Sequence, residues 1–412
     1  MSGPSDGALT APGGSGETAD GRQALSGLRV LDLSRWVAGE YATKMLADFG
    51  ADVVKVEKPG EGSLTRSWGP FPGDIPDPEA SALFLHLNTN KRSVAIDLAE
   101  PGGRALLLDL IATADAVVES FRPGKLERWG LGPDELTARN PRLVLTRISA
   151  FGQDGPYRDY EATGIVLQAM GGPMHATGDA ARPPLRKPGL LEHYTVGRMA
   201  GEATLAALFA ARRAGVGSVV DVSGQEVLLS GADRRASYLM AASYSGVDAP
   251  RGTRSAHRGR TTFTGPFRAK DGFVMVYVTN QAFWNRFVNM VGAQDPQFRR
   301  QFLDRTDVSA DRDQFIAFVR EWFLGRPKQQ IMEEGEAARI PLTAMLELDE
   351  LLDHPHFRGR GVFVRAEHPV AGALDYVGPP WRMNRGFQLR TTAPLLDQHG
   401  EQIRAELSGS AS

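Results

Sequence analysis

Residues 28–60 constrain the fold more than any other segment, because strand and helix patterns alternate within them. Residues 28–33 and 53–56 are short runs rich in Leu and Val, which predict β-strands. Between them, residues 41–49 carry apolar side chains at helical spacing, and a glycine follows where a helix would end. Two strands joined through a helix form a βαβ crossover and pair in parallel. Ligands of open parallel sheets bind beyond the carboxyl ends of the strands, so the loop at residues 34–39 is a candidate binding site.

The alternation of strand and helix continues along the chain and predicts an α/β fold. Further strands are expected at residues 93–98, 116–119, 143–148 and 219–223, and helices at 102–114, 133–139, 200–214 and 226–243. The pattern then changes to a basic, turn-rich loop at 251–265, a strand at 273–279 and an aromatic helix at 283–291.

At 412 residues the chain is long for a single core, so two domains are expected. Residues 1–24 are rich in Gly, Ser, Ala and Pro, which is typical of a disordered tail. We predict this tail at 1–24, a large domain at 25–225, a smaller α+β domain at 226–330, and a linker with a return to the large domain at 331–412.

The composition excludes several kinds of site. A net charge of −2, from 47 Lys+Arg and 49 Asp+Glu, argues against a nucleic-acid surface or a polybasic membrane patch. The absence of cysteine excludes disulfides and thiolate chemistry. No run of 18 apolar residues and no signal segment is visible, so we expect a soluble, cytoplasmic protein. His354 and His356 flank a proline without a third ligand, so no metal site is expected.

Charged side chains in the expected loops are the candidates for chemistry. Cations at Lys58, residues 90–92 and residues 122–128 suit a phosphorylated cofactor, although their spacing alone is explained slightly better by ordinary solvated surface charge. Asp179, Glu192 and His193 could serve as nucleophile or acid/base groups, whereas an isolated carboxylate in a polar segment is usually just exposed.

A resemblance to a known family covers nearly the whole chain from residue 25 onward. Its motifs, in order, are LSGLRVLDLSRWVAG, LADFGADVVKVEKPGEG, LNTNKRSVAIDL, VVESFRPGKLERWGLG, NPRLVLTRISAFGQDGPY, QAMGG, VVDVS, IPLTAMLELDELLDHPHFRGRG and APLLDQHGEQI. This series resembles the class III CoA-transferases, the family of formyl-CoA transferase, carnitine CoA-transferase and α-methylacyl-CoA racemase. The resemblance implies a Rossmann-like large domain, an inserted smaller α+β domain and an interlocked dimer. By matching motif positions, it places CoA or acyl-CoA, bound as a substrate, against Val37, Ala38, Lys58, Ile96, Asp97, Leu98, Ala99, Ser120, Phe121, Arg128 and Ser149.

The sequence departs from this family where the chemistry is expected. The transferases of the family carry a nucleophilic aspartate in a segment like TGEPDGPP, and TGDAARPP at residues 177–184 has Ala181 at that position, with Asp179 two residues earlier. The racemase histidine is also missing, because residues 162–164 read Ala-Thr-Gly, while Glu192 falls at the racemase aspartate. Glu40 replaces a proline that is common after the first-loop glycine.

Three functions follow from the resemblance and its departures. The first is a class III CoA-transferase that uses Asp179 to move CoA between an acyl-CoA thioester and a free carboxylic acid. The second is an acyl-CoA racemase or isomerase that uses Glu192, with His193, for proton transfer. The third is a non-catalytic subunit paired with an active paralogue, so a homodimer and a heterodimer are both open. His257, Arg258 and Arg260 stand where formyl-CoA transferases have a glycine loop, which predicts a dicarboxylic or otherwise anionic acyl group.

Overall fold

The chain forms two compact units in a computed structural model that describes residues 23–179, 181–230, 235–246, 263–383 and 387–409. The larger unit comprises the chain up to residue 252 together with residues 359–412, and the smaller one comprises residues 253–358. Residues 331–358, which the sequence pattern suggested as part of a linker, therefore belong to the smaller unit. The expected tail at 1–24 and the cations His257, Arg258 and Arg260 fall wholly or almost wholly outside the described residues.

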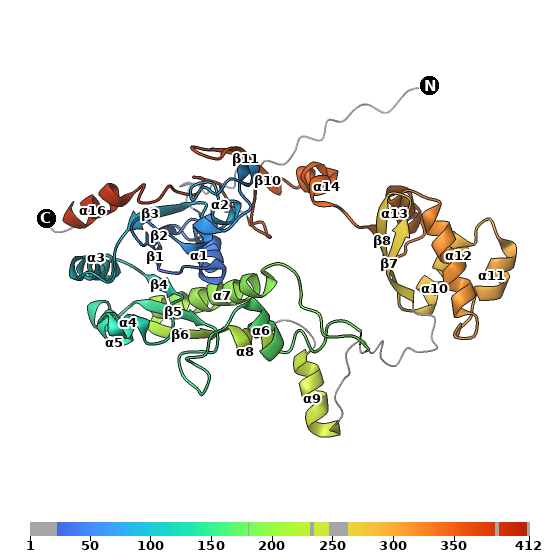
Figure 1. Cartoon of the computed structure of the whole chain (residues 1–412), viewed down its shortest axis with the longest axis horizontal. Coiled ribbons are helices and arrows are strands. Elements are labelled where there is room, and N and C mark those ends of the chain that lie inside the picture. Colours follow the sequence, from blue (N-terminus) through green and yellow to red (C-terminus); the bar gives the residue numbers. More distant parts are fainter. Residues whose placement is uncertain (1–22, 180, 231–234, 247–262, 384–386, 410–412) are drawn as a thin grey trace. The chain divides into compact units, whose positions relative to one another are not determined.

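A six-stranded sheet with the order β3-β2-β1-β4-β5-β6 forms the centre of the larger unit (Figure 1). All five strand pairings are parallel, so the predicted α/β fold with a parallel sheet is confirmed. The order reverses between β1 and β4, which is the switch point of Rossmann-type sheets. The strands are β1 (Arg29–Asp32), β2 (Asp52–Glu57), β3 (Lys91–Ala95), β4 (Ala116–Glu119), β5 (Val144–Ser149) and β6 (Ser218–Ser223).

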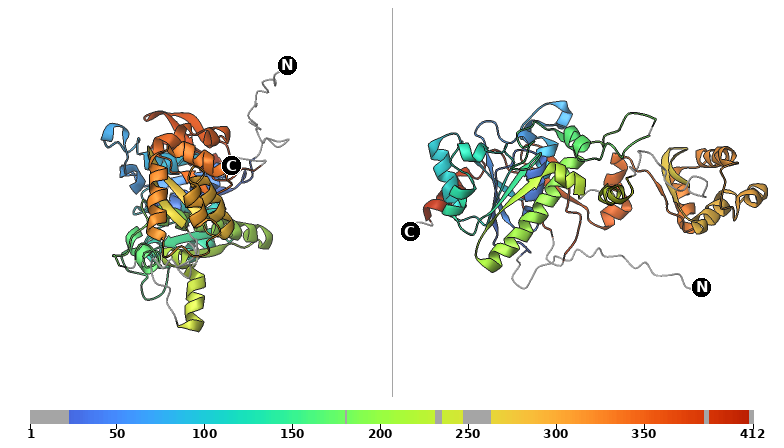
Figure 2. Two further views of the ribbon diagram at one scale, coloured as in Figure 1. Left: turned by 90° about the vertical axis from the view of Figure 1, so that its right-hand side faces the viewer. Right: turned by 90° about the horizontal axis from the view of Figure 1, so that it is seen from below.

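Helices cover both faces of this sheet because its strands are apolar on both sides. Val30 and Val53 pack under α1 (Val37–Asp48) and α7 (Leu191–Ala214), which Figure 1 shows next to each other. Leu31 and Val54, one position along, pack on the opposite face with α3 (Pro101–Ala112), α5 (Pro133–Arg139) and α16 (Gly400–Gly409). Figure 2 shows the same layers from two further directions.

Shorter elements connect these layers and complete the larger unit. They are η1 (Leu64–Ser67), η2 (Pro72–Asp74), α2 (Ala82–Leu87), α4 (Lys125–Arg128), α6 (Gly164–Met170), α8 (Gly224–Ser230), α9 (Arg235–Ser245), α15 (Pro355–Gly359, shared with the end of the smaller unit) and the antiparallel pair β10 (Phe363–His368) and β11 (Gly372–Val377).

The end of the chain packs along the edge strand β3. The Asp397 side chain accepts a 2.7 Å hydrogen bond from the Ala95 amide, and the His399 ring accepts one of 3.2 Å from the Ser93 amide. Arg92 binds Glu406 of α16 at 2.6 Å. Segments that are more than 300 residues apart in sequence therefore share one sheet edge.

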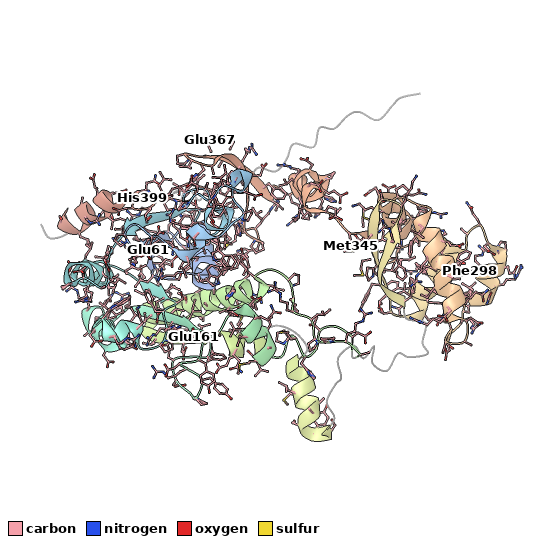
Figure 3. The ribbon with its side chains drawn as sticks, in the orientation of Figure 1. Glu61, Glu161, Phe298, Met345, Glu367 and His399 are labelled. Atoms are coloured by element: carbon pink, nitrogen blue, oxygen red, sulfur yellow. The ribbon has the colours of Figure 1, made fainter. Side chains whose placement is uncertain are left out.

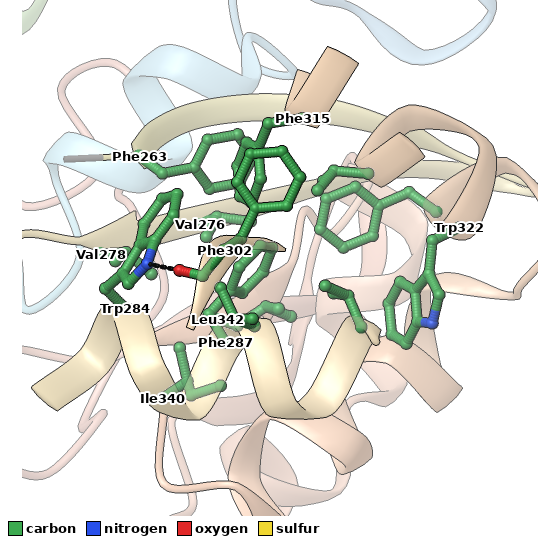
Figure 4. Close-up of a cluster of buried hydrophobic side chains, with 14 of the residues drawn as sticks. Phe263, Val276, Val278, Trp284, Phe287, Phe302, Phe315, Trp322, Ile340 and Leu342 are labelled. Carbon is green, nitrogen blue, oxygen red and sulfur yellow. Dashed lines mark hydrogen bonds between the residues drawn. The ribbon is translucent and has the colours of Figure 1, made fainter. Parts of the chain in front are cut away.

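The smaller unit packs helices on a three-stranded antiparallel sheet, β7-β8-β9. Figure 4 shows its core, in which the Trp284 ring nitrogen donates a 2.8 Å hydrogen bond to the Phe302 carbonyl among buried aromatic rings. The elements are β7 (Phe263–Ala269), β8 (Gly272–Val278), β9 (Leu342–Ala344), α10 (Gln281–Val291), α11 (Pro296–Phe302), α12 (Arg312–Leu324), α13 (Lys328–Ala337) and α14 (Leu348–Asp353).

Four expected elements have different bounds in the structure. The helix expected at 41–49 begins at Val37, so the loop expected at 34–39 ends at residue 36. The strand expected at 93–98 spans Lys91–Ala95, so residues 96–100 form a loop before α3. The helix expected at 200–214 begins at Leu191, nine residues earlier, because the polar residues ahead of the small-residue run also adopt helical conformation. The helix expected at 226–243 is divided into α8 and α9, with residues 231–234 outside the description.

Candidate active site

A cavity of about 230 Å³ lies at the carboxyl edge of the sheet, beside the switch point. We call it the switch-point cavity. Apolar side chains and three cations from the loops after β1 to β4 line it, so it suits a flat apolar ring that carries an anionic group. Its walls are Leu33, Ser34, Arg35, Val56, Glu57, Lys58, Gly62, Ser63, Ile96, Asp97, Leu98, Ala99, Phe121, Lys125 and Trp129.

A buried network of charged side chains lies beneath this cavity. Lys91 donates to Asp32 at 2.9 Å, and Lys55 lies 3.2 Å from Glu40, with all four side chains fully buried. Burial favours the neutral form of Asp32, but the charges of Lys55 and Lys91 outweigh it and lower the pKa of this carboxyl. Burial favours the neutral form of Lys91 too and lowers the pKa of this amine, despite the opposing charge of Asp32. The four groups therefore neutralise one another instead of facing a ligand.

Glu40 connects this network to the cavity wall. Its carboxylate accepts hydrogen bonds from Ser63, and from Thr65 at 2.7 Å. Lys55 donates to the carbonyl of Ser34 at 2.7 Å. Since Ser34 and Ser63 both line the switch-point cavity, the Glu40–Lys55 pair holds two of its loops in place.

A second cavity, of about 330 Å³, shares Phe121 with the first. We call it the arginine cavity. The Nη1 atom of Arg128 and the Nη2 atom of Arg158 each lie 3.5 Å from the position that a Cβ would take on Gly124, so the two guanidinium groups converge there. Ser120, Ser149 and Arg122 also contribute to its walls. Converging guanidinium groups are suited to phosphate.

A third cavity, of about 190 Å³, contains a buried carboxylate. Glu192, in the first turn of α7, has 4% of its surface exposed and accepts a 2.7 Å hydrogen bond from Gln168 of α6. We call this space the Glu192 cavity, and Lys187 and Arg198 supply its cations. A carboxylate held in a cavity beside cations can act as a nucleophile or as a base.

His193 connects this region to the loop after β1. Its Nε2 atom lies 3.8 Å from Glu192 Oε1, and its ring packs edge-on to Trp36 with centroids 6.0 Å apart. Burial lowers the pKa of His193, and the charge of Glu192 opposes that effect. Trp36 directly precedes α1 and packs in turn on Trp68. Through His193, Glu192 is therefore connected to the candidate binding loop after β1.

The structure distributes the expected CoA-binding residues among these places. Lys58, Ile96, Asp97, Leu98 and Ala99 line the switch-point cavity, Ser120, Arg128 and Ser149 line the arginine cavity, and Phe121 lines both. Val37 and Ala38 are buried in the first turn of α1 and are not among the residues that line these two cavities.

Several of the expected cations already have acidic partners. Lys58 pairs with Glu61 and Arg122 with Glu161, and Figure 3 labels both glutamates. The interpretation of residues 90–92 as phosphate-binding cations was wrong for Lys91 and Arg92. These two residues begin β3, where Lys91 binds Asp32 and Arg92 binds Asp52 at 2.7 Å.

The two candidate catalytic carboxylates occupy different surroundings. Asp179 is exposed, and its side chain accepts a 2.8 Å hydrogen bond from the Ala181 amide. Glu192 is buried in its cavity. The structure thus separates the two residues by environment, although each was singled out in the sequence as a lone carboxylate.

Sequence reasoning missed Trp129 and Arg158 as cavity residues, and Gln168 as the partner of Glu192. Gln168 lies in the QAMGG motif, which marked this position in the sequence but did not indicate that its side chain binds Glu192. Among the described residues, no group of three or more His, Cys, Asp or Glu side chains could hold a metal ion. None of the helices in the described ranges combines the length and apolar character needed to cross a membrane.

Comparison with known proteins identifies the family. Residues 25–400 match the CoA-transferase family III. A succinyl-CoA–D-citramalate CoA-transferase of Chloroflexus aurantiacus is 33% identical over 411 residues, which cover 93% of this chain and 94% of the relative. A succinate–glutarate CoA-transferase of Agrobacterium fabrum is 31% identical over 387 residues, covering 93% and 95%. The crystal structure of a CAIB/BAIF family protein from Brucella suis matches with a TM-score of 0.80 and 28% identity, over 94% of this chain and all 100% of that one. This chain is therefore a member of CoA-transferase family III.

Proposed function

We propose that this protein is a CoA-transferase that moves CoA between an acyl-CoA thioester and a free carboxylic acid, with Glu192 as its nucleophile. The observation that carries the proposal is the buried Glu192 carboxylate in a cavity with Lys187 and Arg198. Asp179 is the weaker candidate because it is exposed, and water would compete with any substrate there. Family membership supports the general reaction.

The proposed reaction proceeds by exchange at the Glu192 carboxyl. A carboxylate oxygen attacks the thioester carbonyl carbon, the C–S bond breaks, and CoA leaves as a thiolate while a mixed anhydride forms. The thiolate then attacks the glutamyl carbonyl carbon and expels the first acid as a carboxylate, which leaves a glutamyl-CoA thioester. The acceptor acid reverses these two steps, so that Glu192 is regenerated and the charge is conserved throughout.

We propose that CoA lies along the carboxyl edge of the sheet. The apolar walls and cations of the switch-point cavity suit the adenine and a phosphate, and the guanidinium groups of the arginine cavity suit a further phosphate. The loop at Trp36 leads from this edge towards His193 and Glu192, which is the direction that the thioester arm would need to take.

The acyl group is proposed to be a dicarboxylic or otherwise anionic acid. Lys187 and Arg198 in the Glu192 cavity support this substrate class, because each can pair with a second carboxylate. Relatives that are named for D-citramalate, succinate and glutarate transfer support it as well. His257, Arg258 and Arg260 remain proposed substrate ligands.

Assembly as an interlocked homodimer, with the smaller unit as an inserted domain, belongs to the same proposal. Phe209 of α7 is 65% exposed and Val219 of the edge strand β6 is 45% exposed, so apolar surface is available to a second chain. The alternative assembly is a heterodimer with a paralogue, and identifying the chains present in the purified assembly distinguishes the two.

Mass spectrometry of the protein incubated with succinyl-CoA tests the nucleophile, with D-citramalate, glutarate and oxalate as acceptors. We expect a CoA adduct on the peptide that contains Glu192, lost in Glu192→Gln and retained in Asp179→Asn. Glu401→Gln is the matched control, because Glu401 also lies in the first turn of a helix, α16, and is exposed. An adduct on Asp179, or full turnover in Glu192→Gln, would overturn the assignment.

A second candidate function rests on the 3.8 Å separation between His193 Nε2 and Glu192 Oε1. Such a pair could remove and return a proton at the acidic carbon next to the thioester, as in a racemase or isomerase. Incubation of a 2-methylacyl-CoA in D2O distinguishes this function. Deuterium at that carbon without an enzyme-bound CoA adduct would replace the transferase assignment.

A further inference from the structure

The space occupied by the Glu192 carboxylate exists because residue 164 is glycine. A Cβ on Gly164 would lie 1.7 Å from Glu192 Oε1 and 2.7 Å from its Cδ, which is far inside van der Waals contact. The φ angle of Gly164 lies outside the left-handed region, so the backbone itself does not demand glycine. Glycine is also a poor helix former, and Gly164 is the first residue of α6. Glycine is therefore needed at position 164 because any side chain would occupy the space of the Glu192 carboxylate.

Gln168, one helical turn further along α6, holds the other carboxylate oxygen. Its Nε2 atom donates to Glu192 Oε2 at 2.7 Å, and its Oε1 atom accepts from the Lys187 amide at 2.8 Å. Because the Lys187 amide can only donate, the Gln168 side-chain amide has a defined orientation with its NH2 group towards Glu192. Gln168 is 2% exposed, so water does not compete for these bonds.

We propose that Gly164 and Gln168 are positioning residues that hold the Glu192 carboxylate for attack through Oε1. Residues four apart on a helix share one face, so α6 presents both groups to Glu192 at once. Gln168 binds Oε2, and Gly164 makes room for Oε1, which is also the oxygen nearer to His193. This inference rests on the proposed role of Glu192 and explains how that side chain is aimed.

Gly164→Ala is the direct test, with Gly102→Ala as its matched control. Gly102 is also near the start of a helix, α3, and a Cβ there would meet nothing within 4 Å. A displaced nucleophile costs about 100-fold in rate per 1 Å. We therefore expect Gly164→Ala to slow formation of the CoA adduct on Glu192 by about that factor, with CoA affinity in calorimetry unchanged. Gly102→Ala should match the wild type in both measurements.

A double variant tests whether space is the cause. Glu192→Asp withdraws the carboxylate from Gly164, so adding Gly164→Ala to it should cost little further activity, and the two effects should be strongly non-additive. Additive effects would overturn the spatial explanation. If Gly164→Ala fails to fold, Gln168→Leu replaces it, because it removes the donor at similar size. We expect this variant to lower kcat at an unchanged KM for acyl-CoA, and an unchanged kcat would overturn the role of Gln168.

The outcomes separate this inference from the proposed function. Full turnover in Glu192→Gln overturns the function and the positioning inference with it. An inactive Glu192→Gln combined with wild-type adduct formation in both Gly164→Ala and Gln168→Leu leaves the function standing and overturns the positioning inference alone.

Discussion

Removing Glu40 should destabilise the larger unit far more than removing an exposed glutamate nearby. Glu40→Ala removes the carboxylate whose Oε1 atom lies 3.2 Å from Lys55 Nζ. It also removes the buried hydrogen-bond acceptor of Ser63, Thr65 and Asn88. Breaking a buried ion pair by removing one partner costs about 3–5 kcal/mol. Asp32 still lies 3.5 Å from Lys55 and offsets part of the loss, so we expect a value near the lower end of that range.

Glu61→Ala is the control, because the side chains of Glu61 and Lys58 are 57% and 48% exposed. An exposed pair contributes about 0.2–1 kcal/mol. Native-state hydrogen exchange of the α1 amides measures the opening free energy of the larger unit alone, which suits a chain of two compact units. Equal losses in Glu40→Ala and Glu61→Ala would refute the argument that burial makes this network costly to break. Glu40→Gln should lie between them, because it keeps the size of the side chain and loses its charge.

The remaining predictions concern binding, pH dependence, the second core and assembly. Lys58→Ala and Arg128→Ala should each weaken CoA binding by about 1.5–3 kcal/mol in calorimetry. Arg139→Ala is the control and should leave CoA binding unchanged, because Arg139 pairs with Asp109 on the surface. Unchanged affinity in the first two variants would contradict the proposed CoA path. Burial, with the charge of Lys44, lowers the pKa of His86 from 6.5 to about 4, so stability present above pH 6.5 should be lost as the pH falls towards 4. This loss is at most about 3–4 kcal/mol, and His86→Gln should flatten that part of the stability curve. Phe315→Ala should destabilise the smaller unit by about 3–5 kcal/mol in urea unfolding, since Phe315 is 1% exposed at the centre of the aromatic core. Light scattering should give the mass of a dimer at micromolar concentration, and a stable monomer would contradict the interlocked assembly.

Sequence patterns predicted the sheet of the larger unit well because most of its strands are short apolar runs bounded by turns, β3 with its two leading cations being the exception. The expected strands at residues 116–119 and 219–223 agree with β4 and β6 to within one residue. Helix starts were less predictable. The first turn of α7 contains Glu192 and His193 in a polar context, and no apolar stripe distinguishes it from a loop.

The local pattern also misled where a polar side chain is buried by partners that are distant in sequence. Lys91 looked like a surface cation, yet its partner Asp32 is 59 residues away and lies two strands across the sheet. Charge and spacing along the chain carry no information about such a partner, because the sheet order determines it.

By itself, the sequence determined the parallel α/β sheet, the loops at its carboxyl edge and the family. These follow from local hydrophobic periodicity, turn residues and the order of the motifs, each of which is readable along the chain. Only the tertiary structure decided which carboxylate is buried, because Glu192 gains its environment from Gly164 and Gln168 of another helix. Desolvation and hydrogen-bond partners set the chemistry of a carboxylate, and both depend on contacts that form only when the elements pack.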